Sequence, residues 1–284
     1  MFYFPAEASL SEEKQKSKDW SGYSLIVAAV SVGNVGQLTT DLVVSTLEMT
    51  KVGYIYDESL LPVVGNHPYS AVNSSSCSLM TGCEVYECEE KKLVVLLQRA
   101  PFAKGKQSGY RKRLVQWIKE QMFGQVIILT SSSAHERLDV QLHGSQFRFL
   151  LSPGQESTVG DFLQNKLKWK PLEKRPCFPA PSAIESESNR DQNMVSLYIP
   201  GGGIAKTLFT DCCDAEIPVS VLLLFCAEGD NAWHAKYLAT ILNQWMNLVP
   251  MPMSPNLLMP SDIWKIPPSW RLTFGNTFDQ TLFH

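Results

Sequence analysis

Short apolar runs alternate with amphipathic segments along the first part of the chain. Residues 24–30 form a continuous apolar run bounded by turn-forming residues, which is typical of a buried strand in a parallel sheet. Apolar side chains then recur at helical spacing from Val35, so residues 36–49 are predicted to form a helix with one apolar face. Residues 52–56 follow as a second strand. This pattern predicts a β-α-β unit with a right-handed crossover.

The same alternation continues to about residue 250. Five further strands are predicted, at residues 84–88, 92–98, 125–130, 194–199 and 219–226. Apolar stripes at helical spacing predict helices around three sets of residues: Tyr110, Leu114, Trp117 and Ile118; Val159, Phe162, Leu163 and Leu167; and Leu238, Ile241, Leu242, Trp245 and Val249. Strands that alternate with helices indicate an α/β fold.

The distribution of polar residues, proline and serine divides the chain into three parts. Residues 1–20 are expected to be a polar N-terminal leader, and residues 21–250 to be the α/β domain. Within that domain, residues 178–193 combine prolines, serines and charges as a flexible insertion does. Residues 251–284 are a proline-rich segment followed by an aromatic C-terminal tail.

Composition excludes several classes of protein. Apolar residues make up 44% of the chain and charged residues 19%, so a sizeable core can form. The 25 basic and 28 acidic residues give a net charge of −3, which disfavours binding to nucleic acid or to anionic lipid. The longest apolar runs are far shorter than the ~20 residues of a membrane span, and the first 20 residues lack the features of a secretion signal.

Cysteine and histidine spacing indicates a reducing compartment and no metal site. The seven cysteines are scattered without a Cys-x-x-Cys pair, which fits the cytoplasm or nucleus better than a disulfide framework. The five histidines share no metal-ligand spacing with one another or with the cysteines, and the adjacent Cys212 and Cys213 have poor chelate geometry. Neither a metal nor a cofactor is predicted.

A glycine-containing turn at residues 31–36 is the first candidate for a nucleotide site. It lies between the first predicted strand and helix and resembles Gly-x-Gly-x-x-Gly, with Ser31 in place of the first glycine. Asp57 follows the next strand, at the spacing where a dinucleotide site places the carboxylate that binds ribose hydroxyls. The alternative is that Gly33 and Gly36 only let strand and helix approach closely. We favour this structural role because the turn-forming glycine is missing.

A second turn contains three consecutive glycines, Gly201, Gly202 and Gly203. Lys206 and Thr207 follow it, as in a phosphate-binding loop, but Ala205 stands where that loop needs a glycine before the lysine. The backbone amides then cannot surround a phosphate in the usual way. An α/β enzyme that binds a nucleotide or nucleoside through the turns at Gly33/Gly36 and Gly201 to 203 is the alternative function.

Two other places could carry chemistry, and both have simpler explanations. Serines at positions 131–133 are followed by His135 and Asp139, so a nucleophile, a base and an acid can be named. The Gly-x-Ser-x-Gly elbow is absent, and serines that end a strand are more often turn formers. Residues 228–231 follow the last strand and could hold a ligand, but N-capping of the next helix explains them more simply.

One basic cluster stands out at the start of a predicted helix: Lys104, Lys106, Arg111, Lys112 and Arg113. It could face an acidic partner surface. A solvated helix face is the more common explanation of such a charge run, and we favour it.

Five segments, in this order, closely resemble the proteasome assembly chaperone 2 family: residues 29–38 (AVSVGNVGQL), 62–69 (PVVGNHPY), 199–208 (IPGGGIAKTL), 227–231 (AEGDN) and 264–275 (WKIPPSWRLTFG). The resemblance covers nearly the whole chain after about Trp20. Residues 1–20 and 178–193 match weakly.

The resemblance implies a non-enzymatic chaperone that pairs with proteasome assembly chaperone 1 as a heterodimer. Such a chaperone binds α-type subunits of the 20S core particle, promotes α-ring assembly and prevents α-rings from dimerising. The implied fold is a three-layer α/β/α arrangement with a mostly parallel central sheet, similar to nucleoside phosphorylases. That scaffold accounts for glycine turns that look like nucleotide motifs but lack their decisive residues. The expected location is the cytoplasm and nucleus.

The last three residues, Leu282, Phe283 and His284, resemble the hydrophobic-tyrosine-any motif with which proteasome-binding proteins enter pockets between α subunits. Phenylalanine replaces tyrosine here. The lost hydroxyl removes one potential hydrogen bond, with a net contribution of about 1 kcal/mol, so the motif is weakened rather than abolished. A frayed chain end without a function is the alternative.

Overall fold

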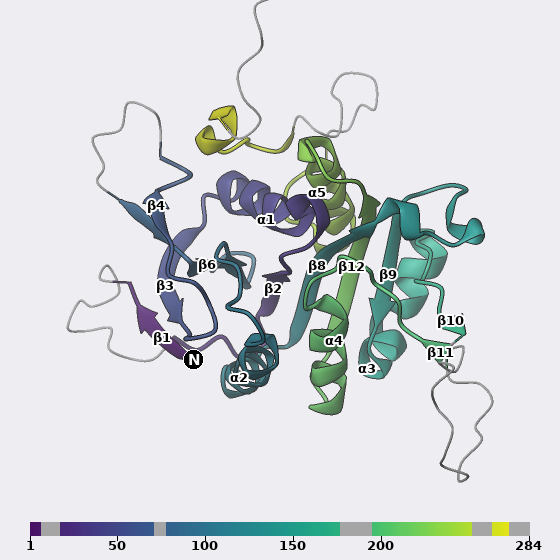
Figure 1. The fold of residues 1–284 in the computed structure, drawn as a ribbon, viewed down its shortest axis with the longest axis horizontal. Helices are drawn as coiled ribbons and strands as arrows, with labels where there is room; N and C mark the ends of the chain where they lie inside the picture. The colour runs from purple at the N-terminus through teal and green to yellow at the C-terminus, as the bar shows by residue number, and fades with distance from the viewer. Residues whose placement is uncertain (7–17, 71–77, 177–194, 252–262, 273–284) are drawn as a thin grey trace, which may run out of the picture.

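The computed structural model describes residues 1–6, 18–70, 78–176, 195–251 and 263–272, and these form a large sheet with helices on both faces (Figure 1). The eight strands of the sheet, in spatial order, are β1 (Phe2–Pro5), β3 (Thr50–Tyr56), β6 (Cys83–Cys88), β7 (Leu93–Gln98), β2 (Ser24–Ala28), β8 (Gln125–Ser133), β12 (Val219–Cys226) and β9 (Phe147–Leu151). The apolar runs of the sequence predict all of these strands except β1 and β9.

The sheet is parallel at its centre and antiparallel toward both edges. Strands β7, β2, β8 and β12 are parallel to one another, whereas β9 at one side and β6, β3 and β1 at the other pair antiparallel. The expected parallel sheet is therefore found in the middle of a mixed sheet. Strand β3 is parallel to β2, as the predicted β-α-β unit requires, but the hairpin β6–β7 lies between them.

Four long helices cover the two faces of the sheet (Figure 1). Helices α1 (Val35–Thr46) and α5 (Ala232–Met246) pack on one face, and α2 (Gln107–Glu120) and α4 (Ala205–Asp214) on the other. Side chains of β2 alternate between the two cores: Leu25 and Val27 pack with α2 and α4, and Ile26 packs with α1 and α5. The three-layer arrangement is confirmed. The likeness to nucleoside phosphorylases stays a prediction.

Shorter elements complete the described part of the chain. They are β4 (Val64–Asn66) paired with β5 (Leu79–Thr81), β10 (Arg175–Pro176) paired with β11 (Val195–Ser196), η3 (Val32–Asn34), η4 (Ala134–Glu136), η5 (Asp139–Gln141), α3 (Pro153–Gln155), η6 (Glu156–Gly160), η7 (Phe162–Lys166) and η9 (Pro268–Leu272). The strand expected at residues 194–199 is represented by β11, outside the main sheet. The helix expected around Val159 is present but wound largely as π-helix. Across the described helices, none is long and apolar enough to span a bilayer.

Segments expected to flank the α/β domain take part in it. Strand β1 pairs with β3, and the Trp20 side chain is buried and donates from Nε1 to Glu87 Oε1 at 2.8 Å. Toward the other end, Trp264 is buried and donates from Nε1 to Thr240 Oγ1 at 3.0 Å. Both tryptophans bury a large apolar ring and satisfy their one donor, so they anchor these segments to the sheet and to α5.

Candidate functional site

The turns at residues 31–36 and 200–203 meet at the carboxyl ends of β2 and β8, where the sequence places its candidate nucleotide site. Their backbones bond to one another: Val32 N donates to Gly201 O at 2.9 Å, and Ser133 N donates to Pro200 O at 3.0 Å. The Ser132 hydroxyl also donates to Pro200 O, at 2.9 Å. These polar groups are already satisfied within the protein, so they are not directed at a ligand.

The glycines of these turns are needed for close packing. Gly33 has φ +63°, and a Cβ there would lie 2.2 Å from Asn231 Nδ2. Gly203 has φ +59°, and its Cβ would lie 2.1 Å from Val30 O. Both positions therefore combine a left-handed backbone with a contact that leaves no room for a side chain. This geometry supports the structural role favoured from the sequence and gives the nucleotide-binding alternative no cradle for a phosphate.

Asp57, the candidate ribose ligand, is fully engaged inside the protein. Arg113 donates to both carboxylate oxygens, from Nε and from Nη2, each at 2.7 Å. The Ser59 backbone N–H donates to Asp57 Oδ1 at 2.9 Å. Burial by itself raises the pKa of the Asp57 carboxyl, but the hydrogen bonds from Arg113 and Ser59 outweigh it and hold this pKa below its ordinary value. Asp57 therefore joins β3 to α2 and does not serve a nucleotide.

The candidate hydrolase residues are not brought together. Ser131 is buried, with its hydroxyl oxygen 2.7 Å from that of Ser31. His135 is 81% exposed and lies 3.7 Å from Glu136 Oε1. The expected turn-forming role of these serines is wrong as well, because all three belong to β8 and pair with β12 up to Ser133.

Residues 228–231 serve the start of α5. The Asp230 carboxylate accepts a hydrogen bond from Ala232 N at 2.9 Å, and Asn231 Nδ2 donates to Ala227 O at 2.9 Å. Asn231 is the N-cap residue of α5, but its side chain makes no capping hydrogen bond and binds the turn instead. The capping explanation therefore holds only for Asp230, which binds the first N–H of the helix.

The basic cluster divides into paired arginines and unpaired lysines. Arg111 donates to Asp211 Oδ2 on α4 at 2.8 Å, and Arg113 binds Asp57. Within the described parts of the chain, Lys104, Lys106 and Lys112 form no ion pair and are exposed, as is Lys119 two turns further along α2. The free positive charge of the cluster therefore comes from these lysines.

Two expectations concern metals and the chain end. Among the described residues, no group of three or more His, Cys, Asp or Glu side chains could hold a metal ion. Leu282, Phe283 and His284 lie outside the described residues, so their role as a binding tail stays a prediction.

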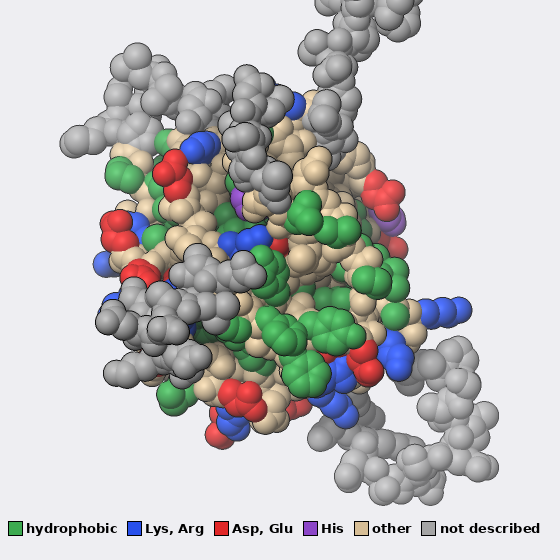
Figure 2. Space-filling view, turned by 90° about the vertical axis from the view of Figure 1, so that its left-hand side faces the viewer, with side chains coloured by type: hydrophobic (Ala, Val, Ile, Leu, Met, Phe, Trp, Pro, Cys, Tyr) green, Lys and Arg blue, Asp and Glu red, His purple; other side chains and the backbone are tan. Residues whose placement is uncertain are grey.

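An apolar surface that no sequence pattern described above predicts lies at the β1 edge of the sheet (Figure 2). We call it the aromatic groove, and its residues are Phe2, Phe4, Tyr54 and Tyr56 on the floor and Leu61, Val63 and Val64 on the wall. Opposite residues of antiparallel strands share a face, and the register places Phe2 opposite Tyr56 and Phe4 opposite Tyr54. A cavity of about 580 Å³ lies between Tyr54, Tyr56 and the wall.

A signal for the floor was present in the sequence. Phe2 and Phe4 alternate with Tyr3 in β1, and Tyr54 and Tyr56 alternate with Ile55 in β3, the neighbouring strand of the sheet. Aromatic residues at alternate positions favour a strand with two distinct faces. The charges of residues 12–18 conceal this short pattern when the first 20 residues are averaged.

Known proteins resemble this chain in sequence and in fold. The model of the PAC2 family matches residues 25–228. Proteasome assembly chaperone 2 of Danio rerio is 40% identical over 264 residues, which cover 93% of this chain and 96% of that protein. Proteasome assembly chaperone 2 of Homo sapiens is 40% identical over 272 residues, which cover 95% and 98% of the two chains.

Solved structures of archaeal proteins share the fold at low identity. Pyrococcus furiosus PbaA, described as an archaeal homolog of proteasome-assembly chaperone, has a TM-score of 0.58 and 14% identity, with 84% of this chain and 88% of PbaA covered. Pyrococcus furiosus PbaB, an archaeal proteasome activator, has a TM-score of 0.57 and 12% identity, with 88% and 90% covered. Because the family model spans most of the chain and relatives at 40% identity align over more than nine-tenths of it, the chain belongs to the PAC2 family, the family of proteasome assembly chaperone 2.

Proposed function

We propose that this protein forms a heterodimer with proteasome assembly chaperone 1 and binds α-type subunits of the 20S core particle. In this role it promotes α-ring assembly, prevents α-rings from dimerising, and acts in the cytoplasm and nucleus. The observation that carries the proposal is the 40% identity to proteasome assembly chaperone 2 of two vertebrates over nearly the full length of both chains.

The proposed role is binding without catalysis. The turns that resemble nucleotide motifs are closed by their own hydrogen bonds, and the Asp57 carboxylate is held by Arg113. The aromatic groove instead offers a broad apolar surface at the molecule's side. These features favour a protein that acts by occupying the surfaces of other proteins.

Residues 282–284 are proposed to reach a pocket between neighbouring α subunits. There Leu282 and Phe283 would bury apolar surface, and the terminal carboxylate after His284 would meet a lysine. A three-residue tail binds weakly alone. Joined to a globular face and to the partner's own tail, it gains effective concentration, which can raise avidity by roughly 10².

Deletion of residues 282–284 tests this mechanism. The heterodimer that carries the shortened chain should bind isolated α-rings at least about tenfold more weakly by surface plasmon resonance, because one of its linked attachments is lost. Pairing with chaperone 1 and the unfolding midpoint should stay unchanged.

The substitution Phe283→Tyr tests the same mechanism in the opposite direction. It restores the hydroxyl of the motif, and one hydrogen bond of about 1 kcal/mol should tighten α-ring binding about fivefold. Equal α-ring affinity for the full-length and shortened chains would exclude the tail from the mechanism.

A further inference from the structure

The aromatic groove gathers a large share of the exposed apolar side chains of the described residues. Sixteen large apolar side chains are exposed among those residues, and six of them lie in the groove, whose seventh residue, Tyr54, is half-buried. Phe2 is 63% exposed, Tyr56 61% and Val64 68%. Monomeric proteins rarely expose a continuous apolar patch of this kind unless it binds something.

The floor of the groove is held rigidly from beneath. The Tyr3 ring points to the opposite face of the sheet and packs against Trp20 at 5.6 Å and Trp117 at 6.5 Å between centroids. Its hydroxyl donates to Val52 O at 2.8 Å. A strand fixed in this way presents Phe2 and Phe4 without an ordering cost at the moment of binding, which favours tight association.

Contact through side chains suits this edge better than addition of a strand. Among the residues that the structure describes, strand β1 pairs on one side only, with β3, and no described strand pairs with its other edge. Pro5 lacks an N–H group and interrupts the row of donors that an added strand needs. The recognition element is therefore the aromatic and aliphatic face.

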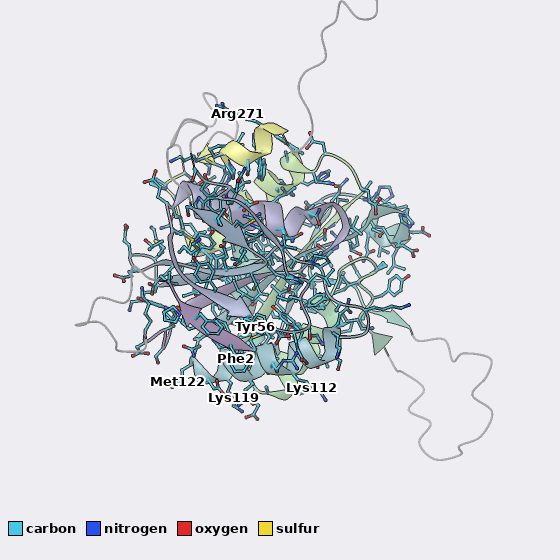
Figure 3. The ribbon with its side chains drawn as sticks, turned by 60° about the vertical axis from the view of Figure 1, so that its left-hand side comes forward. Phe2, Tyr56, Lys112, Lys119, Met122 and Arg271 are labelled. Carbon is cyan, nitrogen blue, oxygen red and sulfur yellow. The ribbon has the colours of Figure 1, made fainter. Side chains whose placement is uncertain are left out.

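Free lysines of α2 lie on the same side of the molecule as the groove, although α2 packs on the face of the sheet opposite the groove floor. Figure 3 shows Lys112 and Lys119 of α2 on the same side of the molecule as Phe2, Tyr56 and Met122. Met122 lies two residues beyond the end of α2 and is itself 63% exposed. The two lysines form no ion pair with any residue that the structure describes.

Two further lysines approach the wall of the groove from the chain that precedes α2. Ala103 N donates to Ser59 O at 2.8 Å, and Leu61 N donates to Pro101 O at 3.0 Å, so residues 101–103 lie beside the start of the wall. Lys104 and Lys106 come next and are exposed. Glu58 and Glu120 are the exposed acidic residues nearby in sequence, so lysines outnumber them in this border.

We propose that the aromatic groove and its lysine border bind the partner chaperone of the heterodimer, which presents an apolar segment bordered by carboxylates. This inference rests on the proposed function. A constitutive partner fits better than a transiently bound α subunit, because long-lived interfaces are larger and more apolar than short-lived ones. The lysines would attract the partner's carboxylates and orient its approach.

The experiment compares two double variants, each co-expressed with chaperone 1. Tyr56→Ser with Val64→Ser removes apolar surface from the groove, and should weaken the heterodimer at least about thirtyfold, as expected for central interface residues. Trp233→Ser with Val140→Ser is the matched control, because these side chains are 59% and 64% exposed but lie outside the groove. The control should leave the dissociation constant within about threefold, as measured by analytical ultracentrifugation.

A charge reversal tests the border without removing packed side chains. Lys112→Glu with Lys119→Glu should slow association about tenfold at low salt, and added salt should reduce this difference. Lys170→Glu with Lys206→Glu makes the same change in net charge on other exposed lysines and should have little effect. If the Tyr56→Ser, Val64→Ser variant unfolds at a lower temperature and its binding cannot be interpreted, the comparison of the two lysine variants tests whether this surface binds the partner.

The outcomes separate the inference from the proposed function. If the unchanged chain pairs with chaperone 1 and both groove-side variants pair equally well, the inference is wrong and the proposed function stands. If the unchanged chain does not pair at all, both are wrong. Loss of self-association or of α-subunit binding, with normal pairing, would assign the groove to a different occupant and overturn the inference.

Discussion

Asp57 has the spacing of a ribose-binding carboxylate in a dinucleotide site, but its role in this protein is an internal ion pair. It directly follows β3, where a dinucleotide site would need it, but Arg113 of α2 binds both of its oxygens at 2.7 Å. The sequence places Asp57 correctly after a strand. It does not reveal Arg113 as the partner, because no spacing rule links residues that far apart.

Asp57→Asn should destabilise the protein in a pH-dependent way. Since the folded-state pKa of Asp57 lies below its unfolded value, its charge stabilises the protein above about pH 4, and this contribution is lost as the pH falls further. At pH 7 the substitution should lower the free energy of unfolding by about 2 kcal/mol, as expected for charged hydrogen bonds. Urea unfolding between pH 7 and pH 3 should show the two proteins converging toward acid.

Glu58→Gln is the control for that substitution. Glu58 is the exposed neighbour of Asp57, and it does not accept the hydrogen bonds that Arg113 and Ser59 donate to Asp57. Its replacement should change the free energy of unfolding by less than about 0.5 kcal/mol at either pH. A constant difference between Asp57→Asn and the unchanged protein across the pH range would show that the ion pair is not the cause.

At the scale of elements, periodicity predicts the strands and helices better than it predicts their neighbours. The apolar runs locate β2, β8 and β12 within a few residues, because each is buried on both faces. The order of strands depends on pairings between distant segments, so the insertion of the β6–β7 hairpin beside β2 is not visible in any local pattern. The aromatic groove as a whole could not be predicted from local patterns either, because its floor and wall come from three segments that are separate in the sequence.

Gly203→Ala tests whether the glycine turns exist for packing. A Cβ at Gly203 meets Val30 O at 2.1 Å and also adopts an unfavourable φ of +59°, so the substitution should cost at least about 3 kcal/mol. Gly105→Ala is the matched control, because Gly105 has φ +75° with nothing within 4 Å of its Cβ. The control should cost about 1 kcal/mol by chemical denaturation. Equal losses for the two variants would mean that contact with Val30 is unimportant.

At the scale of the whole molecule, the closed turns and the open groove favour protein binding over catalysis. The resemblance in sequence predicted the family and the layered fold, whereas the binding surface became apparent only from the folded arrangement. A family resemblance identifies the family to which the chain belongs. It does not say which side chains the chain leaves uncovered.

A thermal-shift screen distinguishes the two functional classes. Nucleotides and nucleosides at millimolar concentration should leave the unfolding midpoint unchanged, while chaperone 1 should raise it. A ligand present at 100 times its Kd would stabilise the folded state by about 2.7 kcal/mol, which such a screen detects easily. Saturable stabilisation by a nucleotide would favour the enzyme alternative.

The ring cluster beneath β1 has a consequence for synthesis in the cell. Tyr3 and Trp20 are synthesised about one hundred residues before Trp117 of α2, against which they pack. Until then the aromatic first strand has no support and is open to aggregation. Nascent chains of this protein should therefore depend on general chaperones during translation, until the segment that contains Trp117 has been synthesised.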